Sequence, residues 1–148
     1  MEAIMATQTA GLTWTDRTAV TGRLALKVLE YTDCIKRTVD RAKEPGFNES
    51  SWDELAALLD TGVFQRVGND KVAMGWDVYL GLLMQWATKT DFWAEFHRVS
   101  EVGNLVFLEL TEHNTMRGQP ESVVNSLTTY EFDDKRKLVR LGILLQHD

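Results

Sequence analysis

The chain of 148 residues contains one cysteine, Cys34, and two prolines. A single cysteine excludes an internal disulfide and a cysteine-rich metal site. Basic residues are fewer than acidic ones, 16 against 22, and the net charge is −6. This balance argues against nucleic acid or an anionic membrane as the main partner. No apolar run approaches the roughly 18 residues of a membrane-spanning helix, so a membrane protein is not expected.

Length and composition are those of a globular protein with one domain. Hydrophobic residues make up 44% and charged residues 26% of the chain, enough for a core and one internal pocket. The first residues are small and polar and lack the basic start and apolar stretch of a signal peptide. We therefore expect a flexible N-terminal arm over residues 1–14, a single domain over residues 15–148, and a cytoplasmic location.

Helical periodicity dominates the first half of the chain. Apolar residues spaced three and four apart predict a long amphipathic helix from Thr15 to about Ala42, which Pro45 ends. Ser51, with Glu54 three residues later, is typical of a capping box and predicts a short helix over 52–60. A third helix, opened by Gly75, is apolar around much of its circumference and is expected to be well buried.

The second half alternates with period two. Strands are predicted over 92–101, 105–116, 123–132 and 137–146, joined by short turns, with a shorter strand over 63–68. Helices followed by an antiparallel meander indicate an α+β domain whose helices cover one face of the sheet. Alternation places Leu108, Leu110, Glu112 and Asn114 on the inner face of the second long strand. The last strand is partly apolar on both faces, which favours a homodimer formed through the sheet.

The order of these elements resembles the SnoaL-like branch of the nuclear transport factor 2-like superfamily over residues 16–146. The segments that carry the resemblance are the long first helix, the short helix WDELAALLD, the helix start Gly75-Trp76-Asp77-Val78-Tyr79, and the hairpins FHRVSEVGNLVFLELTEHN and TTYEFDDKRKLVRLGILLQ. The resemblance implies a cystatin-like, cone-shaped roll: a curved antiparallel sheet packed on three N-terminal helices around a pocket. Relatives include polyketide cyclases, ketosteroid isomerase, scytalone dehydratase and limonene epoxide hydrolase. A fold shared by these activities implies a pocket more firmly than it implies a reaction.

Four residues are candidates for catalysis. Glu112 ends an apolar strand face, where desolvation would suit it to acid/base work; alternatively it points into water or pairs with Arg117. His97, on the first long strand, belongs to a residue type whose usual pKa of about 6.5 suits proton transfer; the alternative is a structural histidine packed beside Trp93 and hydrogen-bonded to the neighbouring strand. Tyr31 places a hydroxyl on the apolar face of the first helix and would polarise a substrate oxygen, unless it only packs in the core. Asp60 lies where the isomerase branch carries its base, or it is a solvated residue at a helix end.

The remaining candidates would line the pocket and bind substrate, although core packing is the alternative for each. They are Trp76, Tyr79, Trp86, Trp93, Phe96, Leu108, Leu110, Asn114 and Ile143. Two departures from the family's patterns matter. Leu110 and Ile143 occupy positions where the epoxide hydrolase mechanism needs charged residues, and the last strand lacks the acid of the cyclase branch. Three scattered histidines lack the spacing of metal ligands, and no cofactor motif is present, so neither a metal nor a cofactor is expected.

Three functions remain open from the sequence. The first is a cofactor-independent enzyme that acts on a hydrophobic, ring-containing metabolite by proton transfer, as an isomerase, cyclase or dehydratase. The second is a binding module with the same pocket and no chemistry, which the missing acid on the last strand favours. The third is a dimeric interaction protein whose cone is filled by bulky side chains such as Trp76, Trp86 and Trp93.

Overall fold

A six-stranded sheet is the larger layer of the computed structural model, which describes residues 15–147. The strand order is β2-β1-β6-β5-β4-β3. The strands are β1 (Gln65–Val67), β2 (Ala73–Met74), β3 (Thr90–Val102), β4 (Leu105–Met116), β5 (Ser122–Phe132) and β6 (Leu138–Gln146). The predicted meander is confirmed in β3 to β6, which pair antiparallel. The short strand β1 adds a parallel pairing with β6, so the sheet is mixed.

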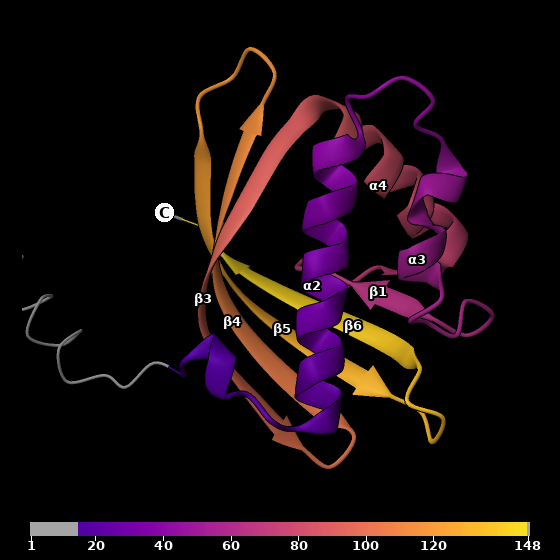
Figure 1. Ribbon diagram of the computed structural model, residues 1–148, viewed down its shortest axis with the longest axis vertical. Coiled ribbons are helices and arrows are strands. Elements are labelled where there is room, and N and C mark those ends of the chain that lie inside the picture. The colour runs from indigo at the N-terminus through magenta and orange to yellow at the C-terminus, as the bar shows by residue number, and fades with distance from the viewer. Residues whose placement is uncertain (1–14, 148) are drawn as a thin grey trace, which may run out of the picture.

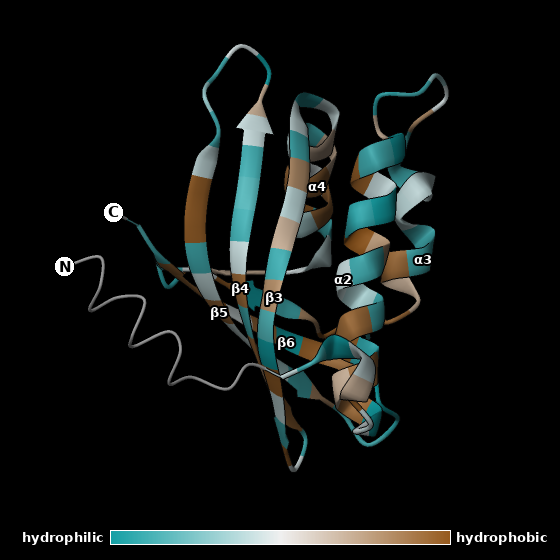
Figure 2. Ribbon diagram, turned by 60° about the vertical axis from the view of Figure 1, so that its left-hand side comes forward, coloured by the Kyte–Doolittle hydropathy of each residue, from teal (hydrophilic) through white to brown (hydrophobic). Residues whose placement is uncertain are grey.

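The helices form a second layer on the concave side of the curved sheet (Figure 1). They are α2 (Arg23–Arg41), α3 (Asp53–Ala56) and α4 (Trp76–Lys89), with 3₁₀ turns η1 (Arg17–Ala19) and η2 (Glu49–Trp52). Figure 2, turned from this view, shows the helices on one side of the curved sheet, and α2 contacts β3 and β4. The α+β cone implied by the resemblance is confirmed. The predicted arm over residues 1–14 lies outside the described residues.

The core lies between the two layers and is built from α2, α3 and the inner faces of the strands. Its largest fully buried side chains include Trp52, Leu55, Phe64, Leu108 and Leu138. The predicted burial of the third helix is wrong in extent. Tyr79, Leu83 and Ala87 of α4 are buried, but Val78 and Leu82 on its other side are 58% and 44% exposed. None of the helices described is long and apolar enough to cross a membrane.

Two helix starts differ from the prediction because distant or neighbouring side chains cap them. The long helix begins at Arg23 rather than near Thr15. Asp16 accepts the Thr18 N–H and caps a separate 3₁₀ turn before the helix. In the first turn of the helix itself, the Ala25 N–H donates to the Glu101 carboxylate of β3. The second helix, α3, follows the 3₁₀ turn η2, and it is this turn that Asn48 caps by accepting the Ser50 N–H; the predicted cap Ser51 accepts the Asn48 N–H in return. Only residues 53–56 of the predicted second helix are α-helical.

An irregularity in the pairing of β3 and β4 interrupts the period-two alternation of side chains along β3. Phe96 pairs with Leu110, but the next pair is Arg98 with Glu109, so His97 is the extra residue. Beyond this bulge Val99 packs against the core, and Arg98 lies on the outer face in an ion pair with Glu109. A bulge of this kind re-aims every later side chain of its strand. The bulge keeps a cation out of the apolar core.

Candidate functional site

A cavity of about 430 Å³ lies between α2, α4 and the inner face of the sheet. Most of its lining is aliphatic or aromatic, with side chains from both layers. A pocket of this size and character suits a small organic molecule. The cone is therefore not filled by its own tryptophans. Polar groups enter the lining at a few places, chiefly Glu112, Arg66, Asn114 and a set of tyrosines.

Glu112 lies in the pocket on the inner face of β4, two residues beyond Leu110. Burial is the largest influence on its carboxyl group and raises its pKa, while the nearby Ser126 hydroxyl and the positive charge of Arg66 act in the opposite direction. Ser126 Oγ is buried and is outside hydrogen-bonding geometry with every described group. Its influence on the pKa of Glu112 is smaller than that of burial. A carboxyl group with a raised pKa is a stronger base when ionised and holds a proton closer to neutral pH.

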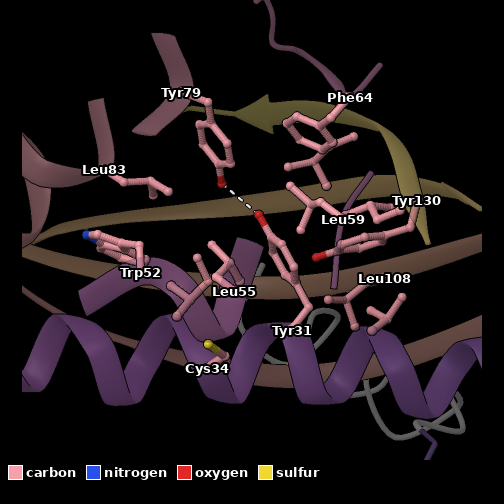
Figure 3. Close-up of a cluster of buried hydrophobic side chains, with 14 of the residues drawn as sticks. Tyr31, Cys34, Trp52, Leu55, Leu59, Phe64, Tyr79, Leu83, Leu108 and Tyr130 are labelled. Atoms are coloured by element: carbon pink, nitrogen blue, oxygen red, sulfur yellow. Dashed lines mark hydrogen bonds between the residues drawn. The ribbon is translucent and has the colours of Figure 1, made fainter. Parts of the chain in front are cut away.

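Three buried tyrosines lie close together, two from helices and one from the sheet (Figure 3), and all three line the same pocket as Glu112. The hydroxyls of Tyr31 on α2 and Tyr79 on α4 are 2.7 Å apart and hydrogen-bonded. The Tyr130 ring of β5 packs edge-on against Tyr31, with 5.5 Å between ring centres. Burial raises the pKa of all three phenols, so they stay protonated. In the hydrogen-bonded pair one hydroxyl donates to the other, which leaves the second proton for a ligand.

Arg66 supplies a positive charge that the sequence reasoning did not assign to the pocket. It lies on β1 in register with Leu141 of β6, and its guanidinium carbon is 5.6 Å from the centre of the Tyr79 ring. At this distance the cation is attracted to the face of the ring. The signal was present in the sequence: Phe64, two residues earlier, is buried, so period-two alternation points Arg66 the same way.

Trp86 and Asn114 form a polar contact within the otherwise aromatic end of the pocket. The indole N–H of Trp86 donates to Asn114 Oδ1 at 3.1 Å, and the Trp86 ring packs edge-on against Phe92 with 5.2 Å between centres. The bond satisfies the indole N–H and fixes the plane of the ring. The pocket therefore offers a rigid aromatic wall to a flat ligand.

Most of the predicted site residues do line this pocket. They are Tyr31, Glu112, Tyr79, Trp86, Phe96, Leu110, Asn114 and Ile143. Trp93 borders the pocket, but its indole stacks on the imidazole of His113, with 3.8 Å between centres, and is half exposed. Their roles in catalysis or binding remain predictions.

Two predicted catalytic residues lie elsewhere. His97 lies on the face of β3 opposite Phe92, Ala94 and Phe96 and is outside the pocket lining; its Nε2 is 2.7 Å from Thr111 Oγ1, whose hydroxyl in turn donates to Asn125 Oδ1 at 2.8 Å. Asp60 lies in the turn before β1, where its carboxylate accepts the Gly62 N–H at 3.2 Å, and it too is outside the lining. Neither side chain lines the pocket that contains Glu112.

Two predicted binding residues belong to the packing behind the pocket. Trp76 packs edge-on against Phe64 and Tyr79, with ring centres 6.4 and 6.0 Å away. Leu108 is fully buried in the core. Neither side chain is part of the pocket lining. Within residues 15–147, no group of three or more His, Cys, Asp or Glu side chains is placed to hold a metal ion.

No family model and no curated protein sequence matches the chain. Solved structures match it in fold at low sequence identity. An NTF2-like protein of unknown function from Cytophaga hutchinsonii is 15% identical, with a TM-score of 0.59 over 86% of this chain and 94% of that one. A candidate SnoaL-like polyketide cyclase from Shewanella putrefaciens is 11% identical, with a TM-score of 0.67 over 87% and 83%. An LEH-like epoxide hydrolase from M. tuberculosis is 16% identical, with a TM-score of 0.56 over 77% and 84%.

Proposed function

Starting from the SnoaL-like, NTF2-like fold of this chain, we propose that it is a small cofactor-independent enzyme that moves protons on a hydrophobic, ring-containing metabolite. The reaction would be an isomerisation, a cyclisation or a dehydration. The observation that carries the proposal is Glu112, a carboxyl group with a raised pKa inside an aromatic pocket. Fold likeness adds only that solved neighbours include proteins described as cyclases, isomerases and hydrolases.

In the proposed reaction Glu112 removes a proton from a carbon next to a carbonyl group of the substrate. The hydroxyl proton of the Tyr31–Tyr79 pair that is not used within the pair forms a hydrogen bond to the carbonyl oxygen and stabilises the negative charge that develops there. Glu112 then returns the proton to another carbon, or to a leaving hydroxyl group. His97 has no part in this scheme because it is outside the pocket.

The proposed substrates are flat, ring-containing molecules such as polyketides, terpenoids or steroid-like compounds. The wall formed by Trp86, Phe92 and Phe96 suits such rings, because aromatic faces pack closely on flat apolar ligands. The buried free thiol of Cys34 fits a reducing compartment, so we propose a cytoplasmic location.

A deuterium-exchange experiment tests the proposed chemistry before the natural substrate is identified. Cyclic ketones such as 2-tetralone are incubated with the protein in D₂O, and exchange at the carbon next to the carbonyl is followed by proton NMR. We expect exchange above the buffer rate for some ketones, reduced at least a hundredfold in Glu112→Gln. Asp60→Asn, which alters a carboxylate outside the pocket, is the matched control and should exchange normally. Full exchange in Glu112→Gln would refute the proposal.

A binding module without chemistry is the second candidate function. The observation that favours it is that β6 contributes only Leu141 and Ile143 to the pocket, and no acid opposite Glu112. This alternative predicts that ketones bind but do not exchange in the unaltered protein.

We also propose that the outer face of the sheet pairs with a second copy of the chain. Leu127 and Leu144 are directly paired across β5 and β6 on that face, and they are 40% and 62% exposed. Adjacent exposed leucines on a sheet are typical of a covered interface. Neither leucine lines the pocket, which is formed by the opposite face of the sheet and the helices.

A further inference from the structure

Arg66 is an unusual cation in this molecule because it is partly buried without an acidic partner. Among residues 15–147, only Arg66 and Arg98 are arginines that are not exposed. Arg98 is paired with Glu109, whereas Arg66 makes no ion pair and no hydrogen bond with any described residue, and its guanidinium lies over the Tyr79 ring. Removing a charge from water without a partner is costly. An anion bound in the pocket would offset that cost.

The charges around the pocket point the same way. Three cationic residues and two acidic residues line it, although the whole chain has a net charge of −6. Arg17 is paired with Asp33, and Lys36 is paired with Asp40, which is not part of the lining. Arg66 is therefore the cation of the lining that is left for a ligand. Glu112 shares the pocket with it but lies too far away for an ion pair.

We infer that Arg66 binds a carboxylate group of the substrate, so that the metabolite is a hydrophobic ring-containing acid. A guanidinium donates two parallel hydrogen bonds to a carboxylate, which fixes the orientation of the ligand as well as adding affinity. With its carboxylate on Arg66, the substrate would lay its ring along the aromatic wall and present one carbon to Glu112. The inference rests on the proposed function, since it assigns the substrate of the same pocket.

The test uses two probes that differ in charge and little in shape, 2-naphthoate and 2-naphthamide. Binding to the full chain at pH 7 is measured by isothermal titration calorimetry. We expect naphthoate to bind at least tenfold more tightly than naphthamide, a difference of about 1.4 kcal/mol. Arg66→Met should abolish the preference, while Arg66→Lys should keep part of it because the charge remains.

The matched control is Arg140→Met. Arg140 lies on β6 beside β1, in register with Gln65, but it is exposed and outside the pocket. It should retain the full preference for naphthoate. If Arg140→Met loses the preference as Arg66→Met does, general surface charge explains it and the inference is wrong. Circular dichroism of each variant verifies folding, and Arg66→Lys provides the comparison if Arg66→Met does not fold.

The possible results separate this inference from the proposed function. Equal binding of both probes by the unaltered protein would overturn the role of Arg66 and leave the pocket and its chemistry intact. A preference for naphthoate that depends on Arg66, without ketone exchange, would support the inference and count against catalysis. If neither probe binds, both the assigned ligand class and the proposed aromatic substrate are wrong.

Discussion

The hydrogen bond between Tyr31 and Tyr79 gives a prediction whose size follows from the structure. Both side chains are buried, 5% and 7% exposed, and their oxygens are 2.7 Å apart. Tyr31→Phe removes one hydroxyl and leaves the other without its partner. A neutral hydrogen bond contributes about 0.5–1.5 kcal/mol, and a buried hydroxyl left unsatisfied costs about 1–3 kcal/mol. Since the hydroxyls border the pocket, where water can enter, we expect a loss of about 1–2 kcal/mol.

Urea denaturation of a double-mutant cycle measures this interaction. Tyr31→Phe and Tyr79→Phe should each lower the free energy of unfolding by about 1–2 kcal/mol, and the double variant by clearly less than the sum. The coupling energy should be about 1 kcal/mol. Tyr130→Phe is the control, because the Tyr130 hydroxyl has no hydrogen-bond partner among the described residues; its effect should stay within about 0.5 kcal/mol. Additive losses in the double variant would refute the proposed pairing.

Three further predictions concern the buried carboxyl group, the core and the outer face. Burial raises the pKa of Glu112, so the folded protein favours the neutral carboxyl group. The stability that this gives is fully present below the ordinary pKa of 4.5 and is lost as the pH rises through the raised pKa. Denaturation between about pH 4 and 8 should therefore show Glu112→Gln gaining stability relative to the unaltered protein as the pH rises; parallel curves would contradict this. Leu108→Ala should cost about 2–5 kcal/mol in urea denaturation, whereas Val72→Ala, at a side chain 57% exposed, should cost less than about 0.5 kcal/mol. An equal effect of the two would place Leu108 outside the core. Leu144→Glu should leave a monomer in sedimentation equilibrium, whereas the unaltered chain should have twice the chain mass at micromolar concentration; an unaltered chain that sediments as a monomer would end the dimer proposal.

Local patterns were sufficient to predict most of the sheet and one side of the pocket. Alternation correctly assigned Leu110, Glu112 and Asn114 to the inner face of β4, because that strand is regular throughout. The SnoaL-like resemblance is confirmed as to fold, since the order of helices and hairpins is what defines this architecture.

The residues that were misplaced depend on contacts between distant parts of the chain. His97 was expected in the pocket, but Phe92, Ala94 and Phe96 line it, so alternation places His97 on the opposite face of β3; which face turns inward is set by packing against the distant helix α2. The apolar Phe64, two residues earlier, marks the inward face of Arg66, but Arg66 was missed because the place of the short strand β1 beside the pocket is set by its pairing with β6, far along the chain. The start of α2 likewise depends on Glu101 of β3. Sequence periodicity cannot report such pairings.

The acid–base property of Glu112 is central to the proposed reaction, and carbon-13 NMR titration of its labelled carboxyl group measures it. The Glu112 carboxyl signal is identified because it is missing from the spectrum of the Glu112→Gln variant. Its chemical shift is then followed from about pH 3 to 9. We predict a pKa above the ordinary value of 4.5, because burial outweighs the opposing effects of Ser126 and Arg66. A pKa at or below 4.5 would contradict the proposed role of Glu112 in proton transfer near neutral pH.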